Sequence, residues 1–343
     1  MSAALQFSRI DASAPGKVVL TGEYAVLAGA PALVMAVDRR ARVALEPVAG
    51  SGWRVTTPGL CDGETQVSGI SEVDETKSQT ETNPDPLAIP RAVFGRASLP
   101  AAAGRLCIDT NELHDPSGRK LGLGSSAAAC AALMTARLRL EFDDGVDREA
   151  LFEQTLSAHR GFQSGRGSGV DVAAAVYGGV LTHRMHKTPA SEDWPDGLHV
   201  TLLWSGQPAS TTDRLRALER ATSDHALAEL ASAAEEAAQR WRSSDCATVQ
   251  TGLAGYAEAL REFDQRTELG IFAAGHDRIA ALAATYADVT YKPCGAGGGD
   301  LGAAFGSDPG ALARFAAEIA AFGFRKLDAG RDPAGARAEI LPS

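Results

Sequence analysis

The sequence has few aromatic residues and few cysteines. Phe, Trp and Tyr together make up 6% of the 343 residues, which argues against a surface on which the bases of a single-stranded nucleic acid could stack. The five cysteines are scattered and contain no C-x-x-C pair; they are Cys61, Cys107, Cys130, Cys246 and Cys294. This number and spacing argue against a disulfide framework or a structural zinc site and favour a reducing, cytoplasmic location.

Long apolar runs and blocks of positive charge are also missing. The best apolar stretch, 26–37, is interrupted by Gly29 and Pro31 and is shorter than the ~18 residues of a membrane span. The N-terminus lacks the basic segment and apolar core of a signal peptide. With 33 Lys and Arg against 43 Asp and Glu, the net charge is −10, so neither nucleic acid nor a membrane is an expected partner. An anionic substrate would have to be met by local donors.

The length and the order of the expected elements indicate two domains. A chain of 343 residues suggests two units of about 150 residues. Strands are expected in the first half, whereas residues 211–268 are almost wholly helical in pattern. The composition shift near residue 190 predicts domains 1–188 and 189–343. The polar stretch 58–90 is expected to be a long loop.

Glycine is in excess, with 36 residues, and one cluster has the composition of a phosphate site. The segment Gly122-Leu-Gly-Ser-Ser-Ala-Ala128 precedes an Ala-rich helical pattern, in which Ser125 and Ser126 are expected at the N-cap. Glycines let the backbone approach a ligand, and the first N–H groups of a helix have no intrahelical partner. The segment therefore predicts a phosphate cradle. An ordinary helix cap would explain one glycine and one serine but explains Gly-x-Gly-Ser-Ser poorly.

Three further segments are weaker signals when each is taken alone. Lys17 lies in 15–24 and by itself would be a surface lysine. Asp171 follows a glycine-rich run, where an N-cap is the more ordinary role. The run 295–300, Gly-Ala-Gly-Gly-Gly-Asp, favours contact with an anion over a plain flexible loop. Neither a Walker A pattern nor a complete G-x-G-x-x-G after a strand is present, so we expect a nucleotide site of another design.

These segments, in this order and spacing, resemble the three sequence motifs of the GHMP kinases, from about Ala14 to Leu327. Within the family they look most similar to the phosphomevalonate kinases. Four stretches carry this likeness: Gly22-Glu-Tyr-Ala-Val-Leu27, Lys120-Leu-Gly-Leu-Gly-Ser-Ser126, Gly167-Ser-Gly-Val-Asp171 with the residues after it, and Gly295-Ala-Gly-Gly-Gly-Asp300. Mevalonate kinases usually carry His in place of Tyr24 and a further Gly in place of Asp300. Their metal-binding Glu is also missing, since the equivalent stretch reads Ser157-Ala-His-Arg160.

The resemblance implies an α+β fold of two domains, the first like ribosomal protein S5 and the second ferredoxin-like. It implies ATP-dependent phosphorylation of 5-phosphomevalonate to 5-diphosphomevalonate in isoprenoid biosynthesis, with Mg²⁺ as cofactor. The implied partners are these small molecules, and the protein would be a monomer or a homodimer. Mevalonate kinase, another small-molecule kinase of the family, diphosphomevalonate decarboxylase and a non-catalytic ATP-binding sensor are the alternatives. The retained Lys17 and Asp171 argue against the sensor.

The resemblance also implies roles for individual residues. Lys17 would neutralise developing charge, and Asp171 would orient it, because a phosphate acceptor that is already ionised hardly needs a general base. The implied ATP-binding residues are Gly122, Leu123, Gly124, Ser125, Ser126 and Ala127, with the Ser126 hydroxyl on the metal. Besides the catalytic pair, the implied acceptor-binding residues are Tyr24, Arg166, Ser168, Gly169, Arg184, Gly295, Ala296 and Gly297. Arg166 and Arg184 are candidates for the acceptor phosphate because a guanidinium can bind it in bidentate fashion, although each could equally be a surface arginine, and Tyr24 could be a core aromatic. No role is predicted for His159.

Overall fold

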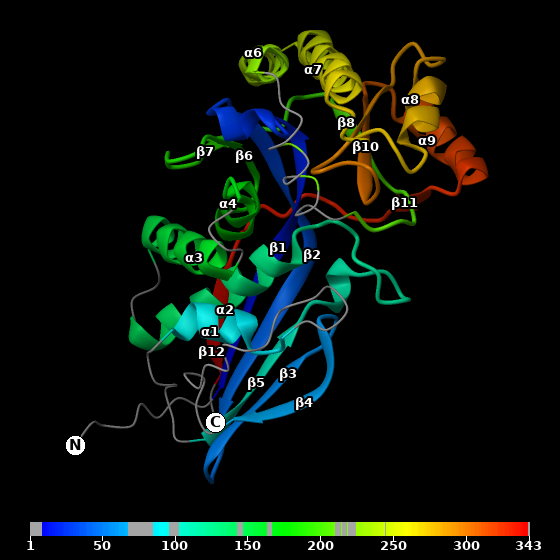
Figure 1. Cartoon of the computed structure of the whole chain (residues 1–343). Helices are drawn as coiled ribbons and strands as arrows, with labels where there is room; N and C mark the ends of the chain where they lie inside the picture. Colours follow the sequence, from blue (N-terminus) through cyan, green and yellow to red (C-terminus); the bar gives the residue numbers. More distant parts are fainter. Residues whose placement is uncertain are drawn as a thin grey trace.

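Two β-sheets, each covered by helices, organise the chain (Figure 1). The computed structural model describes residues 9–67, 85–95, 103–142, 147–162, 167–209, 214, 218, 224–243 and 245–341. The strands of the larger sheet are β1 (Arg9–Thr21), β2 (Ala32–Pro47), β3 (Gly52–Thr57), β4 (Cys61–Val67), β5 (Ala103–Asp109), β6 (Val180–His183), β7 (Ala190–Glu192) and β12 (Arg337–Leu341). With them go α1 (Ala88–Phe94), α2 (Ser125–Glu141), α3 (Arg148–Phe162), α4 (Val170–Tyr177) and the 3-10 helices η1 (Ala25–Ala28) and η2 (Asn111–Leu113).

The smaller sheet is built from the C-terminal half of the chain. Its strands are β8 (His199–Trp204), β9 (Thr290–Pro293), β10 (Leu301–Gly306) and β11 (Arg325–Leu327). Its helices are α6 (Asp224–Trp241), α7 (Cys246–Thr267), α8 (His276–Ala283) and α9 (Pro309–Glu318), followed by η3 (Ile319–Phe322). None of the helices within the described part of the chain is long and apolar enough to cross a membrane.

A long antiparallel pair, β1 and β2, forms the centre of the larger sheet. The order is β12-β1-β2-β5-β3-β4, with β6 beside β2 and β7 beside β6. Among the pairs formed by the described strands, only β3 and β5 run parallel. The helices α2 and α4 lie on β1 and β2. The run 127–132 of α2 is buried to 2% exposure or less, because its alanines and one cysteine let the helix approach the sheet closely. This packing fixes the start of α2 beside the middle of β1.

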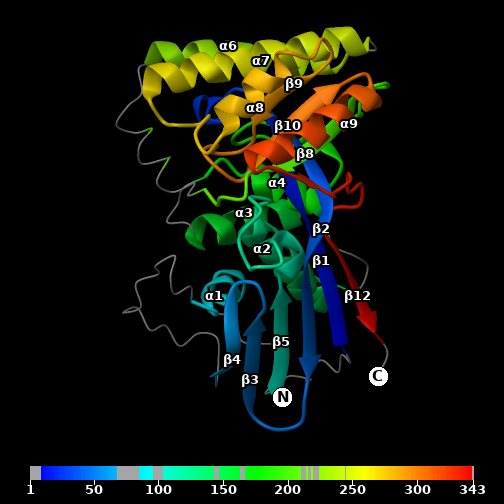
Figure 2. The same ribbon diagram turned by 90° about the vertical axis from the view of Figure 1, so that its right-hand side faces the viewer.

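The C-terminal strand returns to the larger sheet rather than ending in the smaller one. β12 pairs antiparallel with β1 from Arg9↔Leu341 to Ser13↔Arg337, as Figure 2 shows. It thereby covers an edge that would otherwise leave backbone groups unpaired. The buried Arg40 guanidinium binds the Asp332 carboxylate just before this strand. The predicted unit 189–343 therefore does not stay apart, since its last strand belongs to the sheet of the first unit.

The smaller sheet has the connectivity that the resemblance implies. Its order is β11-β8-β10-β9, and the chain runs β8, the helices α6 to α8, β9, β10, α9, β11. This is the β-α-β-β-α-β arrangement of ferredoxin-like folds. The long helices α6 and α7 lie side by side on this part of the molecule (Figure 2). The expected α+β fold class is thus confirmed. The helical pattern expected over 211–268 is found in α6 and α7, while most of 211–223 lies outside the described residues.

The expectation of a loop over 58–90 is partly wrong. Residues 61–67 form β4, which pairs antiparallel with β3, and α1 begins at Ala88. Trp53 of β3 is 2% exposed, so this hairpin buries a large side chain although its second strand is polar. The polar composition of β4 reflects its exposed side chains at the sheet edge. Residues 68–84 lie outside the described part of the chain.

Candidate active site

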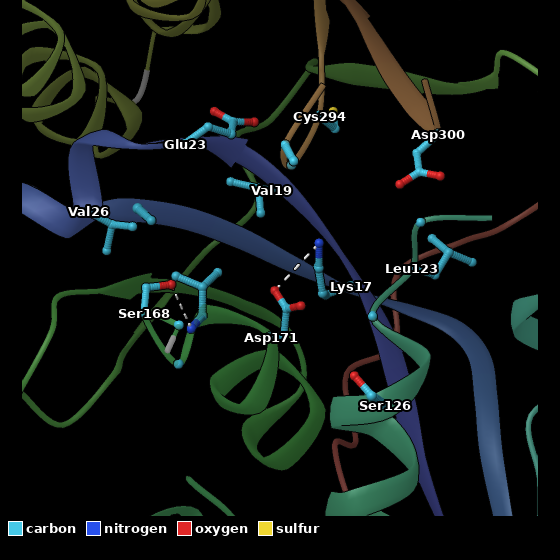
Figure 3. A pocket seen from close by; sticks show the side chains of 18 of the residues that line it. Lys17, Val19, Glu23, Val26, Leu123, Ser126, Ser168, Asp171, Cys294 and Asp300 are labelled. Atoms are coloured by element: carbon cyan, nitrogen blue, oxygen red, sulfur yellow. Dashed lines mark hydrogen bonds and ion pairs between the residues drawn. The ribbon is translucent and has the colours of Figure 1, made fainter. Parts of the chain in front are cut away.

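A cavity of about 310 Å³ opens where β1, the start of α2, the start of α4 and the turn between β9 and β10 meet (Figure 3). The glycine-rich segments and the lysine segment singled out in the sequence all contribute to its wall. The predicted site residues that line it are Lys17, Tyr24, Gly122, Leu123, Gly124, Ser125, Ser126, Ser168, Gly169, Asp171, Gly295 and Ala296. The fold therefore brings together residues that lie far apart in the sequence, such as Lys17 and Ala296.

Among the described residues, three other predicted ones do not line the cavity, namely Ala127, Gly297 and Arg184. Ala127 is fully buried in α2. Gly297 is also buried, and a side chain there would meet the backbone of Ile271, so its role is to let the turn pack closely. Arg166 lies outside the described residues, and its role stays a prediction.

Arg184 is the clearest correction to the predicted acceptor site. Its guanidinium donates two hydrogen bonds of 2.7 Å to the carboxylate of Glu235 on α6. It also donates to the carbonyl of Gly29 at 3.1 Å, and it is not part of the cavity wall. A guanidinium already held by a carboxylate is engaged in joining elements, which removes Arg184 as a candidate for phosphate.

Lys17 and Asp171 form an ion pair in the wall of the cavity. Lys17 projects from β1 with its side chain 10% exposed, and its Nζ lies 3.5 Å from Asp171 Oδ1. The two side chains point toward one another in Figure 3. The N-cap of α4 is Gly169, at φ 85°, so the alternative that Asp171 is merely a cap is wrong. Asp171 lies in the first helical turn with a side chain 39% exposed, which leaves it accessible to a ligand.

Glycine is required where the backbone passes this ion pair. At Gly124 a Cβ would lie 3.3 Å from Lys17 Cε and from Asp171 Oδ2, and at Gly295 a Cβ would lie 3.6 Å from Lys17 Nζ. The Lys17 N–H also donates to the carbonyl of Leu123 at 2.9 Å. The α2 loop and the β9–β10 turn therefore close in on the ammonium from two sides.

The N-cap of α2 is Gly124, not Ser125 or Ser126. Gly124 adopts φ 76°, a left-handed conformation that a serine rarely takes. Ser125 and Ser126 are consequently the first two helical residues. The N–H of Ala128 makes the first helical bond, to Gly124 O at 3.1 Å. The N–H groups before it have no partner within the helix and carry its positive dipole, which is the arrangement that binds phosphate.

His159 contacts the expected metal ligand. Its Nε2 lies 3.2 Å from Ser126 Oγ, and both residues line the cavity. His159 comes from α3 and is 6% exposed. Burial lowers its pKa, an effect that the charge of Asp171 partly opposes. A single histidine in a helix gives no sequence signal of this kind, because the contact arises only where α2 and α3 pack together.

Cations other than Lys17 also line the cavity. They are Lys120, Arg160 and Arg214. Arg214 Nη1 donates to the carbonyl of Leu269 at 2.5 Å, whereas Lys120 is exposed and Arg160 is half-buried. Lys120 lies two residues before Gly122, and this closeness to the glycine segment is the signal by which the sequence could have suggested it. No sequence signal pointed to Arg160, because an arginine in a helix is usually a surface residue.

Asp300 is a further carboxylate in the cavity wall, at the end of the last glycine run. Its Oδ1 accepts a hydrogen bond of 3.0 Å from the N–H of Ala209. A Cβ on Gly122 would lie 2.5 Å from Asp300 Cβ, so the two segments touch. Burial raises the pKa of Asp300 to about 6, while the Ala209 N–H and the charge of Lys17 act in the opposite direction.

A buried ion pair lies behind the cavity wall, to which Glu23 belongs and Lys292 does not. Lys292 Nζ donates to Glu23 Oε1 at 2.5 Å, with side chains 0% and 2% exposed. Next to it the Tyr24 hydroxyl donates to Ala296 O at 2.6 Å, and burial raises the tyrosine's pKa. Tyr24 therefore joins the end of β1 to the β9–β10 turn. Its hydroxyl is already engaged, which favours the core alternative over donation to a substrate.

The donor set fits a Mg²⁺ that arrives with a nucleotide. Among the residues that the structure describes, no group of three or more His, Cys, Asp or Glu side chains could hold a metal ion by itself. The Ser126 hydroxyl and the Asp171 carboxylate are hard oxygen donors in the cavity wall. Mg²⁺ takes such ligands, typically one or two from the protein together with substrate phosphates and water.

Comparison with known proteins places these features in a family. Residues 111–179 match the family model of the GHMP kinases N terminal domain. The chain is 27% identical to the phosphomevalonate kinase of Streptomyces sp. strain CL190 over 85% of its own length and 88% of that protein. It is 32% identical to the mevalonate kinase of Archaeoglobus fulgidus over 49% of its own length and 50% of that protein.

Solved structures share the fold. Streptococcus pneumoniae phosphomevalonate kinase in complex with phosphomevalonate and AMPPNP superposes with a TM-score of 0.75 at 16% identity, covering 94% of this chain and 99% of that one. The Methanococcus jannaschii mevalonate kinase gives a TM-score of 0.70 at 14% identity over 98% and 99%. Residues 111–179 therefore carry the signature of a GHMP kinase N-terminal domain, and the chain is similar in sequence and fold to kinases of the mevalonate pathway. Of the two sequence relatives, the phosphomevalonate kinase is the one matched over most of both chains.

Proposed function

We propose that the protein transfers the γ-phosphoryl group of ATP to the phosphate of 5-phosphomevalonate, giving 5-diphosphomevalonate and ADP. The observation that carries this proposal is the placement of the Lys17–Asp171 pair opposite the unpaired N–H groups of α2, in a cavity with further cations. An acceptor that already bears a phosphate needs these cations, because the chain as a whole carries a net charge of −10. The match to a phosphomevalonate kinase over most of both chains supports the same acceptor.

The nucleotide would lie against the start of α2. Its phosphates would accept hydrogen bonds from the backbone N–H groups of Ser125 and Ser126, where the helix dipole adds positive potential. The Ser126 hydroxyl would hold Mg²⁺, which would supply charge neutralisation at the phosphate oxygens. The apolar wall formed by Val19, Val26 and Leu156 suits the carbon skeleton of the acceptor.

Transfer would depend on positioning and electrostatics. An oxygen of the acceptor phosphate attacks the γ-phosphorus, and the bond to the β-phosphate oxygen breaks, so that ADP leaves with the electron pair. Lys17 would neutralise the charge that develops on the transferring group, while Asp171 holds the ammonium in place. The acceptor oxygen is ionised at neutral pH, so this scheme requires no general base.

The experiment that tests this function measures ADP release with four candidate acceptors: 5-phosphomevalonate, mevalonate, diphosphomevalonate and homoserine. We expect turnover with 5-phosphomevalonate and a diphosphate signal in the ³¹P spectrum of the product. Equal or better use of mevalonate would favour the second candidate, a mevalonate kinase, which the partial match to the archaeal enzyme supports. Loss of CO₂ from diphosphomevalonate would indicate a decarboxylase. Binding of ATP without turnover of any acceptor would indicate a sensor.

The expected cytoplasmic location belongs to this proposal as well. None of the five cysteines, all of which lie within the described residues, is part of a disulfide, as expected of a protein in a reducing compartment.

A further inference from the structure

The contact between Ser126 and His159 joins two helices at the point where the nucleotide is expected. Ser126 is the second residue of α2, and its Oγ lies 3.2 Å from Nε2 of His159 near the end of α3. His159 is 6% exposed, whereas Ser126 is half-buried and open to the cavity. The buried His159 ring therefore contacts a hydroxyl, that of Ser126, which is accessible from the cavity.

A serine hydroxyl in a helix can turn about its Cα–Cβ bond and about its C–O bond. In the first turn of a helix it can point toward the phosphates or back toward its own backbone. A hydrogen bond to a fixed ring removes much of this freedom. When the hydroxyl donates to the ring nitrogen, the lone pairs of Oγ are left for a cation and for solvent.

We propose that His159 is a positioning residue that orients the Ser126 hydroxyl toward the nucleotide-bound cation. This inference rests on the proposed function, because it requires Mg·ATP at Ser126. His159 acts through Ser126 and touches neither the acceptor nor the transferring group. Its contribution should therefore appear in the binding of the metal–nucleotide complex rather than in the choice of acceptor.

The test compares two nearly isosteric substitutions. His159→Gln places a hydrogen-bonding group near the position of Nε2, whereas His159→Met has similar length without one. Both are good helix formers, so α3 should tolerate either. The binding of a non-hydrolysable ATP analogue is measured by calorimetry with and without Mg²⁺, for the wild type, for each variant and for each variant combined with Ser126→Ala.

We expect His159→Met to weaken binding of the analogue about three- to tenfold with Mg²⁺, the usual effect of losing one neutral hydrogen bond, and to leave binding without Mg²⁺ nearly unchanged. His159→Gln should retain most of the wild-type affinity. In the Ser126→Ala background, the two substitutions should have no further effect, because the hydroxyl on which His159 acts is gone. An equal loss in both backgrounds, or with and without Mg²⁺, would overturn the inference.

A second measurement does not depend on ligand binding. The ¹⁵N resonance of Nε2 in His159 should shift when Ser126 is replaced by alanine, and an unchanged resonance would contradict the hydrogen bond. These readouts involve the nucleotide alone. If the wild type uses mevalonate and not 5-phosphomevalonate, the proposed function fails while the inference about His159 is still decided by these data.

Discussion

Lys17 Nζ lies 3.5 Å from Asp171 Oδ1 across the cavity, although Lys17 belongs to β1 and Asp171 to the first turn of α4. Backbone lies close to the pair on both sides, since a Cβ at Gly124 would be only 3.3 Å from Lys17 Cε and one at Gly295 would be 3.6 Å from Lys17 Nζ. The cation and the carboxylate are thus positioned next to one another before any ligand binds.

The first prediction concerns this carboxylate. Asp171→Ala should lower kcat by about 100-fold or more, as expected when a preorganised electrostatic contact is lost, while the affinity for ATP changes little. Steady-state kinetics and nucleotide titration measure the two quantities. Asp277→Ala is the matched control, because Asp277 is an exposed residue that follows a left-handed Gly N-cap in α8, as Asp171 does in α4. Near-normal turnover of the Asp171 variant would reduce this residue to a structural role.

The second prediction concerns the hydroxyl at the start of α2. Ser126→Ala should raise the Mg²⁺ concentration needed for half-maximal rate, because one oxygen ligand of the cation is removed. The rate is measured against Mg²⁺ at fixed ATP. Ser157→Ala, which removes an exposed hydroxyl from α3, should leave the curve unchanged. An unaltered magnesium dependence in the Ser126 variant would contradict its assignment as a ligand.

The third prediction concerns which arginines bind the acceptor phosphate. Arg160 lines the cavity, so Arg160→Ala should raise KM for 5-phosphomevalonate by about ten- to a hundredfold, the cost of ~1.5–3 kcal/mol for a charge-assisted hydrogen bond. Arg184→Ala should leave KM near the wild-type value, because that guanidinium binds Glu235. Arg166→Ala remains predicted by the sequence to behave like the Arg160 variant. A change confined to KM for ATP in the Arg160 variant would show that this residue serves the nucleotide instead.

The fourth prediction concerns pH and stability. Burial raises the pKa of Asp300 to about 6, above its ordinary value of 3.8, so the folded state binds this proton more tightly than the unfolded state does. The contribution of Asp300 to stability must therefore fall as the pH rises from about 4 to 6. Asp300→Asn should gain stability relative to the wild type over this interval, by on the order of 2 kcal/mol.

Urea unfolding of both proteins at several pH values measures this difference. The control is Asp62→Asn, which makes the same chemical change at an exposed position outside the cavity. A constant difference for the Asp300 variant would mean that its carboxylate is ionised equally easily in both states.

The fifth prediction concerns the buried pair behind the cavity. Lys292→Met leaves the Glu23 carboxylate buried without its partner, which typically costs ~3–5 kcal/mol. The double change of Lys292→Met with Glu23→Gln should recover much of this loss in urea unfolding, because no buried charge remains. If the single variant were as stable as the double variant, the unpaired Glu23 carboxylate would carry no burial cost, and the prediction would be wrong.

The sequence by itself identified most of the cavity wall. Glycine at 122, 124, 169 and 295 is informative because a left-handed backbone, or a backbone pressed against another group, admits little else, and all four have positive φ. A left-handed backbone angle is a local property, so glycine at such a position is informative without knowledge of the rest of the fold. The prediction that Ser125 or Ser126 is the N-cap of α2 was wrong. A serine near a helix start can be the N-cap or a residue of the first turn, and the left-handed backbone of Gly124 makes Gly124 the cap.

The tertiary structure decided which charged side chains serve the cavity. Arg160 and Arg184 have the same side chain, yet Arg160 lines the cavity whereas Arg184 is bound by the Glu235 carboxylate of α6. His159 gained its contact with Ser126 from the packing of α2 on α3, and β12 found its place by pairing with an open edge of β1. The partners of a long or titratable side chain come from elements far away in sequence. Electrostatic and hydrogen-bond energies fall steeply with distance and with misalignment, so these roles are fixed only once the chain has folded.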